Sequence, residues 1–91
     1  MLAIRITTVF RGRVQGVGFR YTTKDVARRF LVSGFVQNEA DGSVLCVAEG
    51  EASEIERFLE AVAEAMACNI AAMESTRSVA SGEFDGFTIR R

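Results

Sequence analysis

The sequence predicts an α+β protein in which two helices pack on one face of an antiparallel sheet of four to five strands. Side chains in residues 2–10 alternate between two faces, as they do in a half-buried strand. Residues 19–32 and residues 53–66 repeat apolar side chains at helical spacing. Between these two segments, Asp41-Gly42 is a strong hairpin signal.

Length and composition fit one globular domain spanning residues 1–91. The chain has 91 residues, of which 48% are hydrophobic and 25% charged, a balance typical of a folded protein. A chain of this length buries roughly 60–70% of its unfolded surface, enough for one modest core. Charged residues or Gly interrupt each apolar stretch, so we expect no membrane-spanning segment. The N-terminus lacks the features of a signal peptide, and we expect a cytoplasmic protein.

The first strand is followed by a glycine-rich loop and a helix. Three Gly residues within residues 12–18 predict the loop, because Gly tolerates positive φ angles. The helix is expected to begin near Phe19 or Arg20 and to end at about Val32, with Gly34 as its left-handed cap. The apolar face of this helix consists of Phe19, Thr23, Val26, Ala27 and Phe30.

A hairpin and a second helix come next. Residues 35–37 and residues 43–49 are expected to form its two strands, joined by a turn over residues 38–42. Ser53 and Glu56 have the spacing of a capping box and predict the start of the second helix. The apolar stripe of the second helix consists of Ile55, Phe58, Leu59, Val62 and Met66.

The C-terminal part carries weaker signals. Residues 73–80 read as a poor strand, and residues 84–89 as the final strand. The element order is therefore β-α-β-β-α-β with one extra strand. This order predicts a ferredoxin-like sandwich with both helices on one side of the sheet.

Missing residue types exclude several chemistries. The chain has no His, so Ser–His and Cys–His catalysis and most zinc and haem sites are excluded. Cys46 and Cys68 form no CxxC motif, which indicates two buried thiols in a reducing compartment. We expect neither a metal nor a cofactor.

Charge is distributed unevenly along the chain, although the net charge is only −1. Residues 1–36 hold seven basic residues and one acid, a charge of +6. Residues 37–91 hold four basic residues and eleven acids, a charge of −7. A basic N-terminal part is typical of proteins with an anionic ligand. The alternative is that the two sets of charges interleave once the chain folds.

The segment of residues 12–20 (GRVQGVGFR) carries the clearest chemical signal. A glycine-rich turn at a helix N-terminus leaves backbone N–H groups free to surround an anion. Arg20 adds a guanidinium fork that suits two phosphate oxygens, whereas Arg13 is expected to be solvated. The segment lacks the Gly-Lys-Ser/Thr of a Walker A loop and the third Gly of a dinucleotide fingerprint. The alternative is a plain strand-to-helix turn.

Two segments together resemble the signatures of the acylphosphatase family. Residues 12–20 resemble the first signature, and residues 34–44 (GFVQNEADGSV) resemble the second. The resemblance covers nearly the whole chain and implies a ferredoxin-like fold that hydrolyses the carboxyl–phosphate bond of acyl phosphates. This sequence departs from the family in having Phe35 in place of Trp, which should affect packing only. It also lacks a Pro-containing segment at residues 67–72.

The resemblance also implies roles for individual residues. Arg20 would bind the phosphoryl group of the substrate, and Asn38 would orient the attacking water. Free phosphate or sulfate is also expected to bind in the loop. Backbone N–H groups would come from Gln15, Gly16, Val17, Gly18 and Phe19. Phe19 and Tyr21 are expected to serve packing. Considered alone, Asn38 before an Asp-Gly turn is common for turn geometry.

Several functions remain open at this point. A free-standing acylphosphatase with a small-molecule acyl phosphate substrate is favoured, because the chain ends just after its last strand. A first alternative is a domain acting on carbamoyl phosphate inside a larger maturation enzyme. A second is a phosphate-binding module without turnover, or a nucleic-acid binder that uses the basic half. The overall negative charge disfavours nucleic acid, and a monomer is expected for this size.

Overall fold

The structure, a computed structural model, describes residues 2–91. Met1 belongs to the N-terminal segment that is expected to lack a targeting signal, and it lies outside the described residues. The elements of the structure, in chain order, are β1 (Ala3–Gly12), α1 (Phe19–Ala27), β2 (Val32–Asn38), β3 (Val44–Glu51), α2 (Ala52–Ala65), β4 (Ile70–Val79) and β5 (Phe87–Arg90). None of the described helices is long and apolar enough to cross a membrane.

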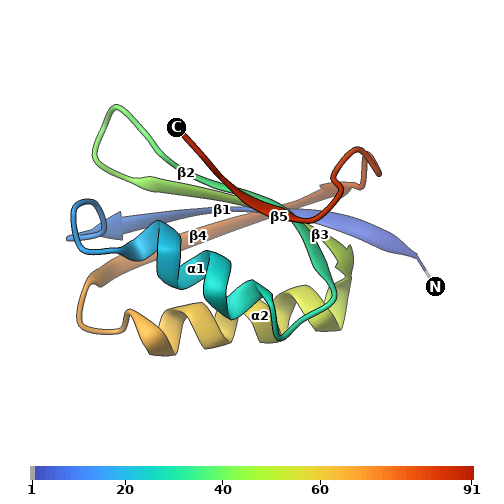
Figure 1. Cartoon of the computed structure of the whole chain (residues 1–91), viewed down its shortest axis with the longest axis horizontal. Helices are drawn as coiled ribbons and strands as arrows, with labels where there is room; N and C mark the ends of the chain where they lie inside the picture. The colour runs from blue at the N-terminus through green and yellow to red at the C-terminus, as the bar shows by residue number, and fades with distance from the viewer. Residues whose placement is uncertain (1) are drawn as a thin grey trace.

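The five strands form one sheet in the order β4-β1-β3-β2-β5 (Figure 1). The pairs β1–β4, β1–β3 and β2–β3 are antiparallel, which confirms the ferredoxin-like arrangement. One detail differs from the expectation, because β5 pairs with β2 in parallel and the sheet is mixed. The chain leaves β4 at one edge and reverses direction on its way to the other edge. This reversal gives β5 the direction of β2.

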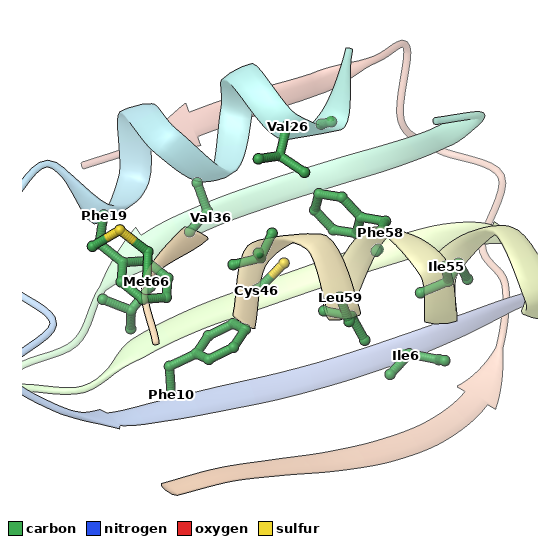
Figure 2. Close-up of a cluster of buried hydrophobic side chains, with 14 of the residues drawn as sticks. Ile6, Phe10, Phe19, Val26, Val36, Cys46, Ile55, Phe58, Leu59 and Met66 are labelled. Carbon is green, nitrogen blue, oxygen red and sulfur yellow. The ribbon is translucent and has the colours of Figure 1, made fainter. Parts of the chain in front are cut away.

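Both helices cover the same face of the sheet, and the core lies between them and the strands (Figures 1 and 2). The predicted apolar stripes point into this layer, so the helical periodicity is confirmed. The ring of Phe10 in β1 lies 5.0 Å from the ring of Phe19 at the start of α1. The fully buried ring of Phe58 in α2 contacts Phe30 at 6.3 Å and Phe87 at 5.3 Å between centroids. These aromatic contacts join elements that are distant in sequence.

The first helix is shorter than predicted, and Gly34 does not cap it. α1 ends at Ala27, after which the backbone N–H groups of residues 28–30 bond three residues back rather than four. Gly34 lies inside β2 with a φ of 143°, where a Cβ atom would overlap the carbonyl oxygen of Val47. Its N–H donates to the carbonyl of Gly86 at 2.9 Å. The close approach of neighbouring strands therefore requires glycine here.

The predicted capping box at the second helix is also wrong. β3 continues to Glu51, and α2 begins at the next residue, so Ser53 lies within the first helical turn. Its hydroxyl donates to the carboxylate of Glu51 at 2.9 Å instead of accepting a backbone N–H. The strand extends further than expected because Gly50 and Glu51 pair with the start of β1.

The poorly predicted C-terminal strand is well formed. β4 begins at Ile70, three residues earlier than expected, and pairs with β1 along almost its whole length. Every residue of β4 after Ile70 is exposed, because this strand forms an edge of the sheet. Burial therefore imposes no alternation on its sequence, which explains the weak pattern.

Residues 80–86, here called the crossover segment, connect β4 to β5 and are held by Glu49. The Glu49 side chain is only 4% exposed. Its carboxylate accepts hydrogen bonds from Arg5 Nε at 2.7 Å, from the N–H of Ser81 at 2.8 Å and from the N–H of Gly82 at 2.9 Å. Burial opposes ionisation, but these hydrogen bonds outweigh it and lower the pKa of Glu49 to about 2.

Phe35, which was expected to affect packing only, packs beneath the crossover segment. Its side chain is 8% exposed, and its ring lies 5.8 Å from the ring of Phe84. The guanidinium of Arg90 lies 3.7 Å above the Phe35 ring. Phe35 is not part of the core cluster under the helices, and its ring instead contacts Phe84 and Arg90.

Candidate active site

The glycine-rich loop occupies residues 13–18, between β1 and α1. Gly16 and Gly18 have φ angles of 75° and 77°, in the left-handed region that favours glycine. A Cβ atom at either position would meet no other atom within 4 Å, so backbone conformation rather than space requires glycine. Gly18 precedes the first residue of α1 and provides no side-chain cap. The first N–H groups of the helix are therefore available to an external acceptor.

A small pocket opens at this loop and brings together residues from two parts of the chain. Its volume is about 90 Å³, and its wall consists of Val14, Gly16, Gly18, Phe19, Arg20, Tyr21 and Asn38. Arg20 lies in the first turn of α1, whereas Asn38 is the last residue of β2. Ligand pockets for drug-sized molecules measure roughly 300–1,000 Å³. This pocket accommodates only a small group, of the size of a phosphoryl group.

The charge of Arg20 is not neutralised by the protein. Within residues 2–91, Arg20 takes part in no ion pair, although Arg5, Arg11 and three other arginines do. The first turn of α1 also contains no acidic residue. A guanidinium and free helix N–H groups that face one small pocket create a positive potential there. This arrangement suits a small anion.

Asn38 stands beside a turn that is held on both sides. The N–H of Glu39 donates to the carbonyl of Ser43 at 2.9 Å and closes the turn. Asp41 accepts hydrogen bonds from the hydroxyl and N–H of Ser43 at 2.6 and 3.0 Å and from Arg11 at 3.2 Å, and these interactions lower the pKa of Asp41 to about 2. No other residue of the described chain forms a hydrogen bond with the Asn38 side-chain amide. It is therefore free to bind a ligand or a water molecule.

The remaining loop residues predicted from the sequence are placed in two ways. Gly16, Gly18 and Phe19 line the pocket, and Phe19 does so while its ring packs in the core. Gln15 and Val17 are not part of the wall. Val17 is 38% exposed, and the Gln15 side chain points toward the turn after Asn38.

Sequence reasoning missed two wall residues. Val14 is fully buried, and its place in the loop carried no signal beyond its apolar side chain. Tyr21 was expected to pack, but its side chain is 65% exposed beside the pocket. Its position directly after Arg20 was the available signal, because the first helical turn already faced the predicted anion site.

The start of the loop is fixed to the segment before β4. The N–H of Arg13 donates to the carbonyl of Asn69 at 2.9 Å. A Cβ atom at Gly12, whose φ is 129°, would overlap that same carbonyl. Residues 67–72 thus anchor the loop through Asn69. Among residues 2–91, no group of three or more Cys, Asp or Glu residues is placed to hold a metal ion.

A larger hollow lies elsewhere, between α2 and β4. Its volume is about 530 Å³, and its wall includes Leu59, Met73 and Ser75. The charged residues at its rim are partly paired, since Arg77 donates to Glu56 at 2.6 Å. Size alone favours this hollow as a ligand site. The smaller pocket is nevertheless the better candidate for an anion, because an arginine without an ion pair, free helix N–H groups and an unbonded amide meet there.

The fold and the pocket define a class of protein: a ferredoxin-like sandwich with a small, arginine-lined pocket at its first strand–helix loop. Solved structures share this architecture. The chain superimposes on the acylphosphatase from Bacillus subtilis with a TM-score of 0.86 and 30% identity, covering 97% of this chain and 99% of that one. It also matches T. kodakarensis HypF with a TM-score of 0.76 and 28% identity, but covers only 12% of that longer chain.

Sequence comparison identifies the family within this class. A family model described as "Acylphosphatase" matches residues 6–89. An acylphosphatase from Salinibacter ruber is 43% identical over 88 residues, covering 96% of this chain and 93% of the relative. One from Thermotoga maritima is 39% identical over 90 residues, covering 99% and 98%. The chain therefore belongs to the acylphosphatase family, as the two signatures predicted. Family and fold support an enzyme that hydrolyses acyl phosphates.

Proposed function

We propose that the phosphoryl group of an acyl phosphate binds in the loop pocket, where its carboxyl–phosphate bond is hydrolysed. In this proposal, Arg20 and the backbone N–H groups of residues 15–19 bind the phosphoryl oxygens, and Asn38 orients the attacking water. One observation carries the proposal: the unpaired guanidinium of Arg20 and the unbonded amide of Asn38 line the same small pocket.

The substrate class suits a site without histidine. The leaving group is a carboxylate, whose conjugate acid has a pKa of about 4. Such a group departs without a proton from a general acid. The protein then needs only to hold the phosphoryl group, disperse its charge and place one water in line. These are tasks that an arginine, backbone N–H groups and an amide perform.

Arg20 and the loop N–H groups supply the electrostatic part of catalysis. Negative charge spreads over the equatorial phosphoryl oxygens in the transition state. A guanidinium binds two such oxygens through parallel hydrogen bonds. Fixed backbone donors stabilise the charge without reorganising during the reaction. The left-handed backbone conformation of Gly16 and Gly18 favours this role, because it turns the loop into the N-terminus of α1.

Asn38 contributes by position rather than by basicity. A carboxamide can orient water through its carbonyl and N–H groups, but it does not accept a proton near neutral pH. The water oxygen attacks phosphorus, and the bond between phosphorus and the acyl oxygen breaks. The proton of the water passes to a phosphoryl oxygen of the substrate. The products are a carboxylate and inorganic phosphate, and the protein ends unchanged.

The size of the pocket limits what the site recognises. A volume of about 90 Å³ holds the phosphoryl group and leaves the acyl group outside. The site therefore selects for the phosphoryl group more than for a particular acyl group. Inorganic phosphate and sulfate should occupy the pocket and inhibit competitively.

The test is hydrolysis of benzoyl phosphate without added metal by the wild type, Arg20→Ala and Asn38→Ala. Each substitution is expected to lower kcat/KM by about 100-fold or more, the loss typical of removing one transition-state donor or misplacing a reactant. Lys24→Ala is the matched control, because Lys24 is an exposed cation on the same helix. A wild-type protein that is folded but inactive would contradict the proposed hydrolysis and favour a phosphate-binding module without turnover. Carbamoyl phosphate as a second substrate tests the alternative taken from the sequence.

Four expectations from the sequence stay predictions. They are a single domain over residues 1–91, a monomer, a cytoplasmic location and the absence of nucleic-acid binding. Sedimentation at micromolar concentration tests the monomer. Salt-sensitive retention on DNA or RNA would contradict the last prediction.

A further inference from the structure

We propose that the side chain of Gln15 is a positioning residue that sets the distance between the phosphate-binding loop and Asn38. The inference rests on the proposed function, in which the phosphoryl group lies in the loop and the attacking water lies at Asn38. It gives Gln15 a role beyond the backbone N–H group that the family resemblance implied.

The geometry shows a direct link from the loop to the turn. Gln15 Nε2 donates one hydrogen bond to the carbonyl of Glu39 at 2.8 Å and another to the carbonyl of Ser43 at 2.9 Å. The two acceptors lie at the neck of the turn, where the N–H of Glu39 also donates to Ser43. Glu39 directly follows Asn38 in the chain. Gln15 therefore holds the backbone immediately beside Asn38.

The link has no substitute in the surrounding backbone. Within the described part of the chain, the two bonds from Gln15 are the only hydrogen bonds between residues 13–18 and residues 38–43. The loop is otherwise anchored on the opposite side, through Arg13 and Asn69. Arg11 also bonds the turn through Asp41 at 3.2 Å, but it lies in β1 and that ion pair is about half exposed. Among the hydrogen bonds of residues 2–91, those of Gln15 alone join the glycine-rich loop to the turn after Asn38.

The Gln15 side chain is unsuited to binding the substrate itself. A Gln side-chain amide has two N–H donors, and both are engaged by carbonyl groups of the turn. The remaining oxygen is an acceptor and would repel phosphoryl oxygens. Gln15 therefore acts through Asn38 and the turn, and it affects the alignment of water and phosphorus rather than phosphate affinity.

Loss of alignment has a distinct kinetic signature. A misplacement of about 1 Å can cost roughly 100-fold in rate. In Gln15→Met, which keeps the length of the side chain without its donors, kcat for benzoyl phosphate should fall by about 10- to 100-fold. The inhibition constant of inorganic phosphate should change by less than about threefold, because Arg20 and the loop N–H groups remain. A merely structural defect would weaken both.

The decisive measurement is a double-mutant cycle with Asn38→Ala. If Gln15 acts through Asn38, adding Gln15→Met to Asn38→Ala should lower kcat by less than about threefold further. Arg11→Met is the control, since it removes the exposed link to the same turn and should leave kcat near the wild-type value. If Gln15→Met does not fold, Gln15→Glu replaces it. Its activity relative to the wild type should rise as the pH falls, because a protonated carboxyl donates one hydrogen bond to the turn.

The outcomes separate the inference from the proposed function. Wild-type kcat in Gln15→Met, together with inactive Arg20→Ala and Asn38→Ala, overturns the inference and leaves the proposed function standing. Losses that multiply in the double variant overturn it as well, because Gln15 would then act independently of Asn38. An inactive wild type overturns the proposed function and the inference with it.

Discussion

Replacing the buried carboxylate of Glu49 with the amide of Gln is expected to destabilise the fold at neutral pH. The pKa of Glu49 falls from its ordinary value of 4.5 to about 2 in the folded protein. A tenfold change in an acid dissociation constant corresponds to about 1.4 kcal/mol, so ionised Glu49 contributes about 3 kcal/mol to the free energy of unfolding. The carboxylate supplies this by accepting bonds from Arg5, Ser81 and Gly82. In Glu49→Gln, an amide N–H group would face one of these donors.

The pH dependence gives the prediction its sign. Because the folded pKa is depressed, the contribution of Glu49 is fully present above about pH 4.5 and is lost as the pH falls through about 2. The wild type should therefore exceed Glu49→Gln by about 3 kcal/mol at pH 7 and by less than about 1 kcal/mol at pH 2. Comparing the two proteins at each pH cancels the titration of the other carboxylates, including Asp41.

The assay is urea unfolding followed by circular dichroism at pH 7, 4, 3 and 2. Glu83→Gln is the matched control, because Glu83 also faces Arg5, at 3.8 Å, but is 60% exposed. An exposed pair of this kind contributes about 0–1 kcal/mol, so the control should resemble the wild type. A difference between wild type and Glu49→Gln below about 0.5 kcal/mol at pH 7, or one that stays constant with pH, would refute the reasoning.

Three further predictions concern packing and reactivity. Gly34→Ala should lower the free energy of unfolding by more than about 3 kcal/mol, because strained backbone alone costs about 1–3 kcal/mol and the new Cβ also overlaps the neighbouring strand. Chemical denaturation checks this. Gly42→Ala, which has a positive φ of 91° but open space around the new Cβ, should cost only the backbone strain of about 1–3 kcal/mol. Phe58→Ala should cost about 3–5 kcal/mol in the same experiment, since its ring is fully buried, and a loss under 1 kcal/mol would contradict the core described above. The sequence predicted two buried thiols, but only Cys46 is buried, whereas Cys68, just after the second helix, is exposed. In the native protein, a thiol reagent should therefore label Cys68 and spare Cys46, whose pKa burial raises to about 12; mass spectrometry with and without urea shows whether this holds.

Local patterns in the sequence predicted most of the fold. Apolar residues at helical spacing identified both helices, since a helix face is set by neighbours three and four positions apart. Asp41-Gly42 identified the hairpin, because the turn depends on a few adjacent residues. The edge strand β4 was weakly predicted for a physical reason: nearly all of it is exposed, so its sequence carries no burial pattern. The parallel pairing of β5 also left no local trace.

Some features of the candidate site were predictable from the sequence, and others follow only from the tertiary structure. The glycine-rich loop and Arg20 were recognisable because nine consecutive residues carry the signal. That Asn38 shares a pocket with Arg20 follows only from the return of β2 to the loop end of the sheet. The exposed position of Tyr21 and the hydrogen bonds of Gln15 to the turn could not be read from spacing. Those bonds span 24 and 28 positions, and nothing in the intervening sequence encodes them.

The sequence by itself determined the family and the element types and singled out the candidate site residues, because each depends on short-range order along the chain. The tertiary structure alone decided how distant segments meet. It placed Gly34 inside a strand against Val47, and it buried Glu49 beneath the crossover segment. It also set the Gln15 side chain between the glycine-rich loop and the turn after Asn38. Such contacts arise from strand pairing across the sheet, where residues far apart in sequence are brought within hydrogen-bonding distance.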